Sequence, residues 1–370
     1  AATRQCPLLI VDASALAPDI FYEDHVQASV PLIVRDVQLL RLKPKWSDAF
    51  LEARAALHVH DEVRLSSGVS DTSFPLTKVA GERSASLTVR DFLGSYRRPN
   101  RTANYYATNL ILPHLADDYP KPFFTELLDH GCASGWCGGL WLGAGTQRSS
   151  LHRDFSENVH GVIEGTKTFT LFPPNETAAL YPRPETANRL GHTTRMPSGA
   201  RTCGGLQRRQ PHACGSDENA SAGHSGDAVE CPRDFDRFGG ALERAFACSV
   251  HEGEMLFLPS GWWHEVDTEG GATSSAGRGN GDDALGRSLS INFWFRAEWP
   301  RETLRLAERE VEDLERPLRA PALRQLGLDL AQRGRAADAS ALLQRSLELE
   351  PDQEVAAVLQ TLRARFGGLL

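Results

Sequence analysis

Alternating apolar and polar positions near the end of the sequence predict a strand with two chemically different faces. Its apolar set is Leu289, Ile291, Phe293 and Phe295, and its intervening set is Ser288, Ser290, Asn292 and Trp294. Because successive side chains point to opposite faces of a strand, the intervening set would face a polar cavity more readily than a dry core. An edge strand with one solvent-exposed face is the alternative.

Two further strand patterns carry candidate chemistry. Residues 151–155 alternate in polarity, so a strand there would point His152 and Asp154 to the same face. The apolar run 255–258 is followed by a Pro-Ser-Gly turn and then by His264, so a returning strand could lie beside the first. Two imidazoles and one carboxylate form a ligand set that favours non-heme Fe(II).

The sequence around these strands predicts flanking helices and two surface insertions. Helices are expected over 47–57 and over 87–96, the second beginning at Thr88. Residues 183–245 and 270–286 are rich in Gly, Ser or Arg and poor in apolar periodicity, which is typical of long loops. A zinc site inside the first insertion would draw on Cys203, His212, Cys214, His224 and Cys231, but incidental cysteines in a loop explain that spacing better.

The C-terminal region, 300–370, is expected to be helical and to resemble a tetratricopeptide repeat from residue 320. The residues at consensus spacing are Leu323, Leu326, Gly327, Leu330, Ala339, Leu343 and Pro351. A single repeat with a following helix over 352–366 cannot bury its own faces, so it would pack against the core, the preceding helix or a second copy in a homodimer. An ordinary helical hairpin is the alternative.

Composition is that of a globular enzyme rather than of a nucleic-acid-binding or membrane protein. The 370 residues are 41% hydrophobic, which supports a core of substantial size. The net charge of −8 provides no basic surface for nucleic acid. No apolar run approaches the roughly 20 residues of a membrane span.

The cysteine pattern favours a reducing compartment, the cytoplasm or the nucleus. The seven cysteines include no C-x-x-C pair, and an odd number leaves at least one unpaired within the chain. Three tripeptides, beginning at Asn100, Asn175 and Asn219, fit the glycosylation pattern and leave the secretory pathway open as the alternative.

Two separated segments resemble the metal-binding halves of the JmjC-domain oxygenases, members of the cupin superfamily. The first runs from His152 through Lys167 to Pro174, and the second joins Gly253–Pro259, Trp262-Trp263-His264 and Ser290–Phe295 in the family's order. The resemblance covers roughly 25–316, is densest over 136–174 and 249–299, and is greatest to the small JmjC protein hydroxylases. It implies a mainly β fold with flanking α-helices, in which a double-stranded β-helix (jelly-roll) core over 136–299 follows an N-terminal α/β buttress over 1–135.

The resemblance also implies roles for individual residues. His152, Asp154 and His264 match the iron ligands, and Lys167 matches the lysine that binds the distal carboxylate of 2-oxoglutarate. Further positions that match the co-substrate pocket are Ser149, Tyr106, Asn158, Asn292 and Trp294, with Tyr105 as an alternative to Tyr106.

The implied activity is that of an Fe(II)- and 2-oxoglutarate-dependent dioxygenase. Such an enzyme consumes O2 and 2-oxoglutarate, releases succinate and CO2, and here would hydroxylate a protein or peptide side chain. Three alternatives remain: lysine N-demethylation, a non-catalytic cupin-like scaffold that binds partners through its helical tail, and a cupin that uses Mn or Zn.

Overall fold

The computed structural model of the chain describes most of the strands and helices. The described residues are 4–55, 62–64, 86–98, 106–111, 115–119, 121–129, 138–182, 194, 235, 237–271, 285–296, 301–314, 316–332 and 335–366. They fall into two compact units, one formed by Ala1–Ala179 with Met196–Ala297 and the other by Leu180–Arg195 with Glu298–Leu370. The cysteines and histidines considered for a zinc site in the first insertion lie outside the described residues.

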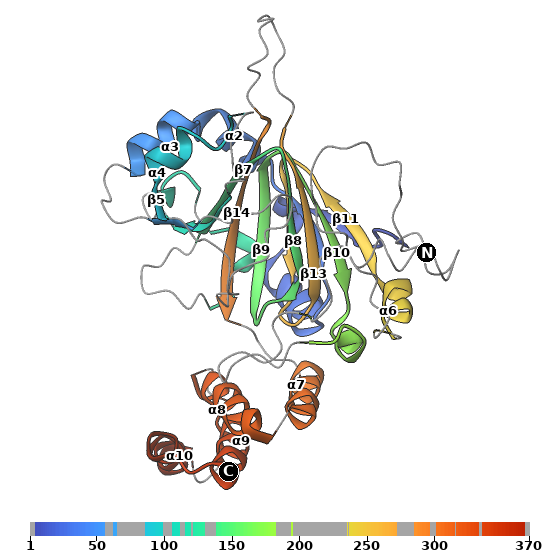
Figure 1. Cartoon of the computed structure of the whole chain (residues 1–370), viewed down its shortest axis with the longest axis vertical. Helices are drawn as coiled ribbons and strands as arrows, with labels where there is room; N and C mark the ends of the chain where they lie inside the picture. The colour runs from blue at the N-terminus through green and yellow to red at the C-terminus, as the bar shows by residue number, and fades with distance from the viewer. Residues whose placement is uncertain are drawn as a thin grey trace, which may run out of the picture. The chain divides into compact units, whose positions relative to one another are not determined.

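Eight consecutive strands form the core of the first unit (Figure 1). They are β7 (Gly138–Ala144), β8 (Thr146–Arg153), β9 (Ser156–Glu164), β10 (Thr166–Phe172), β11 (Phe246–Val250), β12 (Glu254–Leu258), β13 (Trp263–Glu269) and β14 (Arg287–Arg296). One sheet has the order β1-β11-β10-β13-β8 and the other β2-β3-β12-β9-β14-β7-β6. The strands β7 to β10 alternate between the two sheets, as do β11 to β14, which is the topology of the expected double-stranded β-helix.

The N-terminal segment extends both sheets along the same side of the core. Strand β1 (Arg4–Gln5) runs parallel to β11, and β2 (Ile10–Asp12) runs parallel to β3 (Leu32–Arg35). Between β1 and β2, Cys6 forms a disulfide with Cys248 on β11, across 242 residues of sequence. This bond runs against the expectation that the cysteines remain reduced.

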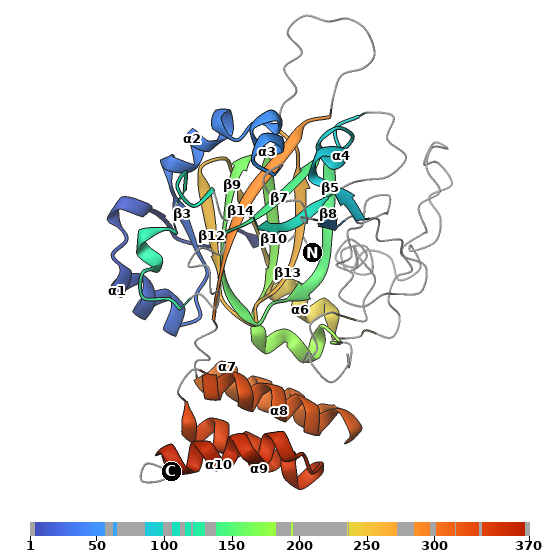
Figure 2. The same cartoon turned by 90° about the vertical axis from the view of Figure 1, so that its left-hand side faces the viewer.

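Short helices from the N-terminal region cover the larger sheet. They are α1 (Pro18–Phe21), the π-helix η2 (Tyr22–Gln27), α2 (Val37–Lys45), α3 (Asp48–Ala55) and α4 (Val89–Leu93). Strand β6 (Ala107–Ile111) is the edge strand of that sheet, beside β7, and β4 (Glu62–Arg64) with β5 (Ser86–Thr88) forms a separate two-stranded sheet. Figure 2 shows α2, α3 and α4 near one end of β7 and β9. Their apolar side chains join those of β12 and β14 in one core that includes Leu39, Phe92, Phe257, Ile291 and Phe293.

The expected helices form with small differences at their ends. Thr88 caps α4 by accepting a hydrogen bond from the Asp91 backbone N–H, as the sequence predicts. Leu87, however, belongs to β5 rather than to the helix, and α4 ends at Leu93 instead of continuing to Tyr96. The helix expected over 47–57 is α3, and residues 56–57 lie outside the described part.

Two sequence predictions need correction. Strand β8 ends at Arg153, so Asp154 lies in the turn that leads to β9 and does not share a strand with His152. The turn is fixed by a hydrogen bond from the Gly261 backbone N–H to the Asp154 carbonyl. The insertion expected over 183–245 is not a loop at its end, because Phe238–Arg244 forms the helix α6, which buries Phe238, Ala241 and Leu242.

The second insertion begins and ends at tightly packed glycines. Gly145 accepts a backbone hydrogen bond from Gly270 and donates one to Gly286. A Cβ atom on Gly270 would lie 2.0 Å from the Gly286 carbonyl oxygen, and one on Gly286 would lie 2.1 Å from that of Gly271. Only glycine allows the two ends of this insertion to approach so closely.

The described part of the C-terminal unit contains four helices: α7 (Arg301–Asp313), α8 (Arg316–Gln332), α9 (Ala336–Leu349) and α10 (Gln353–Phe366). A Cβ atom on Gly327 would lie 2.8 Å from the Leu343 side chain, so α8 and α9 are in close contact at this glycine. The assignment to a tetratricopeptide repeat stays a prediction. Among the described helices, none has the length and apolar character that a membrane span requires.

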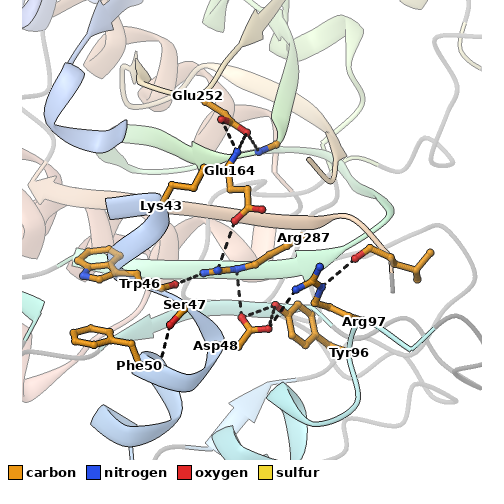
Figure 3. A network of polar contacts seen from close by, with 12 residues as sticks. Lys43, Trp46, Ser47, Asp48, Phe50, Tyr96, Arg97, Glu164, Glu252 and Arg287 are labelled. Atoms are coloured by element: carbon orange, nitrogen blue, oxygen red, sulfur yellow. Dashed lines mark hydrogen bonds and ion pairs between the residues drawn. The ribbon is translucent and has the colours of Figure 1, made fainter. Parts of the chain in front are cut away.

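A buried arginine connects the core to the helices that cover it (Figure 3). Arg287 on β14 donates a hydrogen bond to the Trp46 carbonyl, and its guanidinium lies 3.4 Å from Asp48 and 3.6 Å from Glu164. Asp48 also accepts a 2.8 Å hydrogen bond from the Tyr96 hydroxyl. Since Arg287 is only 5% exposed, its charge depends on these carboxylates for compensation.

We expect Arg287→Met to reduce stability sharply, because it leaves Asp48 and Glu164 without their buried cation. The loss in the free energy of unfolding should be about 2–4 kcal/mol, less than for a fully buried pair because both carboxylates are partly exposed. Urea unfolding measures it. Arg90→Met is the matched control, since the Arg90–Glu52 pair is exposed and should contribute less than about 1 kcal/mol. Equal losses in the two variants would contradict a special role for Arg287.

Candidate metal centre

The pairing of β8 with β13 brings two histidines together. His152 and His264 are register partners on these antiparallel strands, and their ring centroids are 4.1 Å apart. The register shifts between His264 and Val266, a bulge of the kind that re-aims side chains beside functional sites. Asp154 Oδ2 lies 3.6 Å from His264 Nε2 and 4.0 Å from His152 Nε2. The three predicted ligands therefore converge, although Asp154 comes from a turn.

Backbone contacts fix which ring nitrogen each histidine offers. His152 Nδ1 lies 2.7 Å from the Ser150 carbonyl, and His264 Nδ1 lies 3.1 Å from the Trp262 carbonyl. A carbonyl oxygen only accepts hydrogen bonds, so each neutral imidazole carries its proton on Nδ1. The Nε2 lone pairs then point toward Asp154 and are available to a metal. Burial and the neighbouring His152 lower the pKa of His264 well below its usual value, which also favours the neutral ligand form.

The three ligands open into a cavity of about 140 Å³. Lys167 on β10 lines the same cavity and is only 4% exposed. Its Nζ donates to the Tyr106 hydroxyl at 2.7 Å and to the Thr268 hydroxyl at 3.0 Å. Among the described residues these partners are neutral hydroxyls, so the cavity holds an ammonium group without a carboxylate bonded to it. Burial lowers the pKa of Lys167 from 10.5 to about 7.

The other predicted pocket residues lie at this cavity, with one exception. Ser149, Tyr106, Asn158 and Trp294 all line it. Asn292 does not line the cavity but lies behind its wall, fully buried, where its Oδ1 accepts a 2.7 Å hydrogen bond from Trp141 Nε1. Asn292 thus orients Trp141, and its Nδ2 is a longer 3.4 Å from Asn158 Oδ1. The role expected for it at the co-substrate stays a prediction.

The two faces predicted for residues 288–295 match the structure. Leu289, Ile291, Phe293 and Phe295 belong to the core beneath the covering helices. On the opposite face, Ser290 contacts a cavity-lining side chain and Trp294 lines the cavity itself. The strand is central in its sheet, between β7 and β9, rather than at an edge.

Several cavity residues were missed by the sequence analysis. Trp141 on β7 and Phe169 on β10 contribute aromatic walls, and Thr268 on β13 contributes a hydroxyl to Lys167. His160 lines the cavity beside Asn158, and its Nε2 lies 3.0 Å from the Ser290 hydroxyl. Burial, then the charge of Lys167 and then that of His264, lower the pKa of His160 well below its usual value, so it is neutral. His160 is two residues from Asn158 on the same strand, so the sequence already indicated that the two side chains share a face.

The donor set fits ferrous iron. His152, Asp154 and His264 supply ligand atoms that lie within 4.8 Å of one another. Two imidazoles and one carboxylate on one side of an ion leave further coordination positions open, which is the arrangement of non-heme Fe(II) oxygenases. The adjoining cavity gives those open positions space for small molecules.

Comparisons with known proteins agree with this site. The family model described as "Cupin-like domain" matches residues 17–300. Lysine-specific demethylase JMJ32 of Arabidopsis thaliana is 26% identical over 42% of this chain and 40% of the relative. JmjC domain-containing protein E of Dictyostelium discoideum is 24% identical over 74% of this chain and 80% of the relative.

A third relative is named for a different reaction. The human bifunctional peptidase and (3S)-lysyl hydroxylase JMJD7 is 26% identical over 43% of this chain and 42% of the relative. The matches to this protein and to JMJ32 span less than half of each relative's length. The expected resemblance to JmjC-domain proteins is confirmed, and because the family model spans most of the sequence, the chain belongs to the cupin-like domain family.

Proposed function

We propose that this chain is an Fe(II)- and 2-oxoglutarate-dependent dioxygenase that hydroxylates a protein side chain. The observation that carries the proposal is one cavity with a His-Asp-His ligand set and a buried lysine that bonds only hydroxyls among the described residues. A dicarboxylate that also offers a 2-oxo acid group matches both ends of that cavity. The metal would bind the oxo acid, and Lys167 would bind the second carboxylate.

His152, Asp154 and His264 would hold the metal. Bound Fe(II) supplies the oxidising chemistry, in which O2 converts 2-oxoglutarate to succinate and CO2 and one oxygen atom enters a substrate C–H bond. The chain's own contribution is orientation. Each histidine is fixed by its backbone carbonyl, and the turn that carries Asp154 is fixed by Gly261.

The lysine end of the cavity is prepared for an anion. Tyr106 and Thr268 accept two of the three N–H donors of Lys167 and hold its ammonium in a fixed position. Burial raises the pKa of Tyr106 well above its usual value, so its hydroxyl remains neutral beside the incoming carboxylate. Trp141, held by Asn292, and Phe169 supply apolar walls that exclude water and strengthen the charge pairing.

The substrate class is supported by the relatives. JMJD7 is named a lysyl hydroxylase and JMJ32 a lysine-specific demethylase, so both names point to protein lysines. Hydroxylation of an N-methyl carbon gives an unstable product that releases formaldehyde, so one oxidation step underlies both activities. We favour stable hydroxylation of a side-chain carbon, and demethylation is the second candidate because of the names of the Arabidopsis relatives.

His152→Ala should abolish iron-dependent turnover, because two of three ligands cannot hold Fe(II) in the required arrangement. We expect succinate formation from 2-oxoglutarate to fall more than about 100-fold, with loss of bound iron measured by elemental analysis. His251→Ala is the matched control, since His251 is exposed and precedes β12 outside the site. Full turnover in iron-loaded His152→Ala would refute the ligand assignment.

Binding of 2-oxoglutarate should weaken as pH rises above 7. Lys167 has a pKa of about 7, so it is charged below that pH and neutral above it. Because a carboxylate binds the charged form, Lys167 must take up one proton when 2-oxoglutarate binds above pH 7. Anaerobic calorimetry of the Fe(II) protein should show affinity falling about tenfold per pH unit between pH 8 and 9.

Lys167→Arg is the control for this pH dependence. Its guanidinium stays charged throughout the range, so the decline above pH 7 should disappear even if the affinity itself changes. An equally steep decline in Lys167→Arg would assign the titration to another group.

Hydroxylation and demethylation give different products. With lysine-containing protein substrates, hydroxylation adds one oxygen atom to the product and releases no formaldehyde. Mass spectrometry of unmethylated and methylated peptides, with formaldehyde assayed in parallel, separates the two. Formaldehyde release matched to succinate would replace hydroxylation by demethylation.

A further inference from the structure

We propose that this protein matures in the secretory pathway and that Asn175 is a site of N-linked glycosylation. The proposal joins two independent features of the fold: a disulfide that is part of the core, and a glycosylation tripeptide whose asparagine alone reaches solvent. It does not depend on the reaction catalysed.

The Cys6–Cys248 disulfide follows from strand pairing. Arg4 and Gln5 on β1 are parallel partners of Phe246 and Ala247 on β11, so the next positions in register are the two cysteines. Their Cα atoms are 4.7 Å apart. A close approach of this kind is set by the sheet itself and does not require a local loop to bend.

The disulfide lies beside a residue of the cavity wall. Cys248 is fully buried and is the register partner of Phe169, which lines the cavity. Both belong to one apolar cluster with Val266, against which Cys6 and Leu8 pack. The bond therefore fastens the N-terminal segment to the strands of the core. Structural disulfides of this type form and persist in oxidising compartments and are rare in the cytosol.

The tripeptide Asn175-Glu176-Thr177 lies in the 3₁₀-helix η5 (Pro174–Ala179), which follows β10. Glu176 is buried and forms an ion pair with Arg244 on α6. The buried Thr177 hydroxyl donates to the Pro174 carbonyl at 2.6 Å and accepts from Trp263 Nε1 at 2.9 Å. Asn175, by contrast, is exposed.

This arrangement suits a glycan. The contacts of Glu176 and Thr177 fix the turn, so Asn175 is held at the surface and a sugar on its Nδ2 would extend into solvent without displacing a core contact. Glycosylation acts on the chain as it is made, before Thr177 becomes buried. The other tripeptides, at Asn100 and Asn219, lie outside the described residues.

Both covalent steps have defined co-reactants. Disulfide formation removes two electrons and two protons from the Cys6 and Cys248 thiols and reduces a disulfide-carrying oxidant of the compartment. In glycosylation, Asn175 Nδ2 forms a bond to the anomeric carbon of a lipid-linked oligosaccharide. The amide loses one proton, and the lipid pyrophosphate leaves.

The test uses protein isolated from its source cells. The protein is unfolded in denaturant that contains an alkylating reagent, so that all free thiols react, including buried ones. It is then treated with peptide N-glycosidase in H₂¹⁸O, which converts glycosylated asparagine to ¹⁸O-labelled aspartate. We expect the label at position 175 and no alkylation of Cys6 and Cys248 before reduction. Unlabelled Asn175 would overturn the glycosylation site, and alkylated Cys6 and Cys248 would overturn the oxidising compartment.

A matched pair of variants excludes a fortuitous result. In a secretory expression host, Asn175→Gln should remove the mass of one glycan, whereas Thr177→Ser should retain it, because serine preserves both the tripeptide and the buried hydroxyl. Both variants should fold, as judged by thermal unfolding within a few degrees of the wild type. Equal glycan mass in wild type and Asn175→Gln would also overturn the assignment.

Discussion

The antiparallel pairing of β8 with β13 is the constraint on which the proposed active site depends. It makes His152 and His264 direct partners, and the adjoining turn adds Asp154. A slip of one residue between the strands would turn one histidine to the opposite face and separate the ligands. The register is supported from outside the site, because β13 also pairs with β10 over its whole length. Metal binding is thus a property of the sheet as much as of three side chains.

The second constraint is the burial of a lysine inside the same sheet. Lys167 lies on β10. The neighbouring strand, β13, carries His264 and lies between β10 and β8, the strand that carries His152. An ammonium group buried with hydroxyl partners loses solvation that two neutral acceptors do not fully replace. Burial lowers the pKa of Lys167 because of this lost solvation, and a bound carboxylate would compensate for the loss. A bound anion would therefore stabilise the charged form of Lys167.

The sequence predicted those parts of the site that are encoded locally. His152, Asp154, His264 and Lys167 belong to short segments that carry the resemblance to the JmjC-domain oxygenases. The alternation over 288–295 identified the faces of β14 correctly.

Trp141 and Thr268 were missed, because the face they present is decided by pairing with distant strands. Asp154 was assigned to the strand for a similar reason, since its turn depends on Gly261, more than 100 residues away. The pairing of Cys6 with Cys248 could not be predicted from sequence for the same reason, since nothing local relates residues that are 242 positions apart. His160 was also missed, although it is two residues from Asn158 on the same strand and therefore shares its face.

The proposed function requires that one cavity binds a metal and a dicarboxylate together. Its most direct test is an anaerobic titration of the apoprotein with Fe(II) and then 2-oxoglutarate, followed by visible absorption. A charge-transfer band should appear only with both ligands and should weaken strongly in Lys167→Ala. Tight iron binding with no band, and no effect of 2-oxoglutarate, would rule out a shared site for the metal and the dicarboxylate.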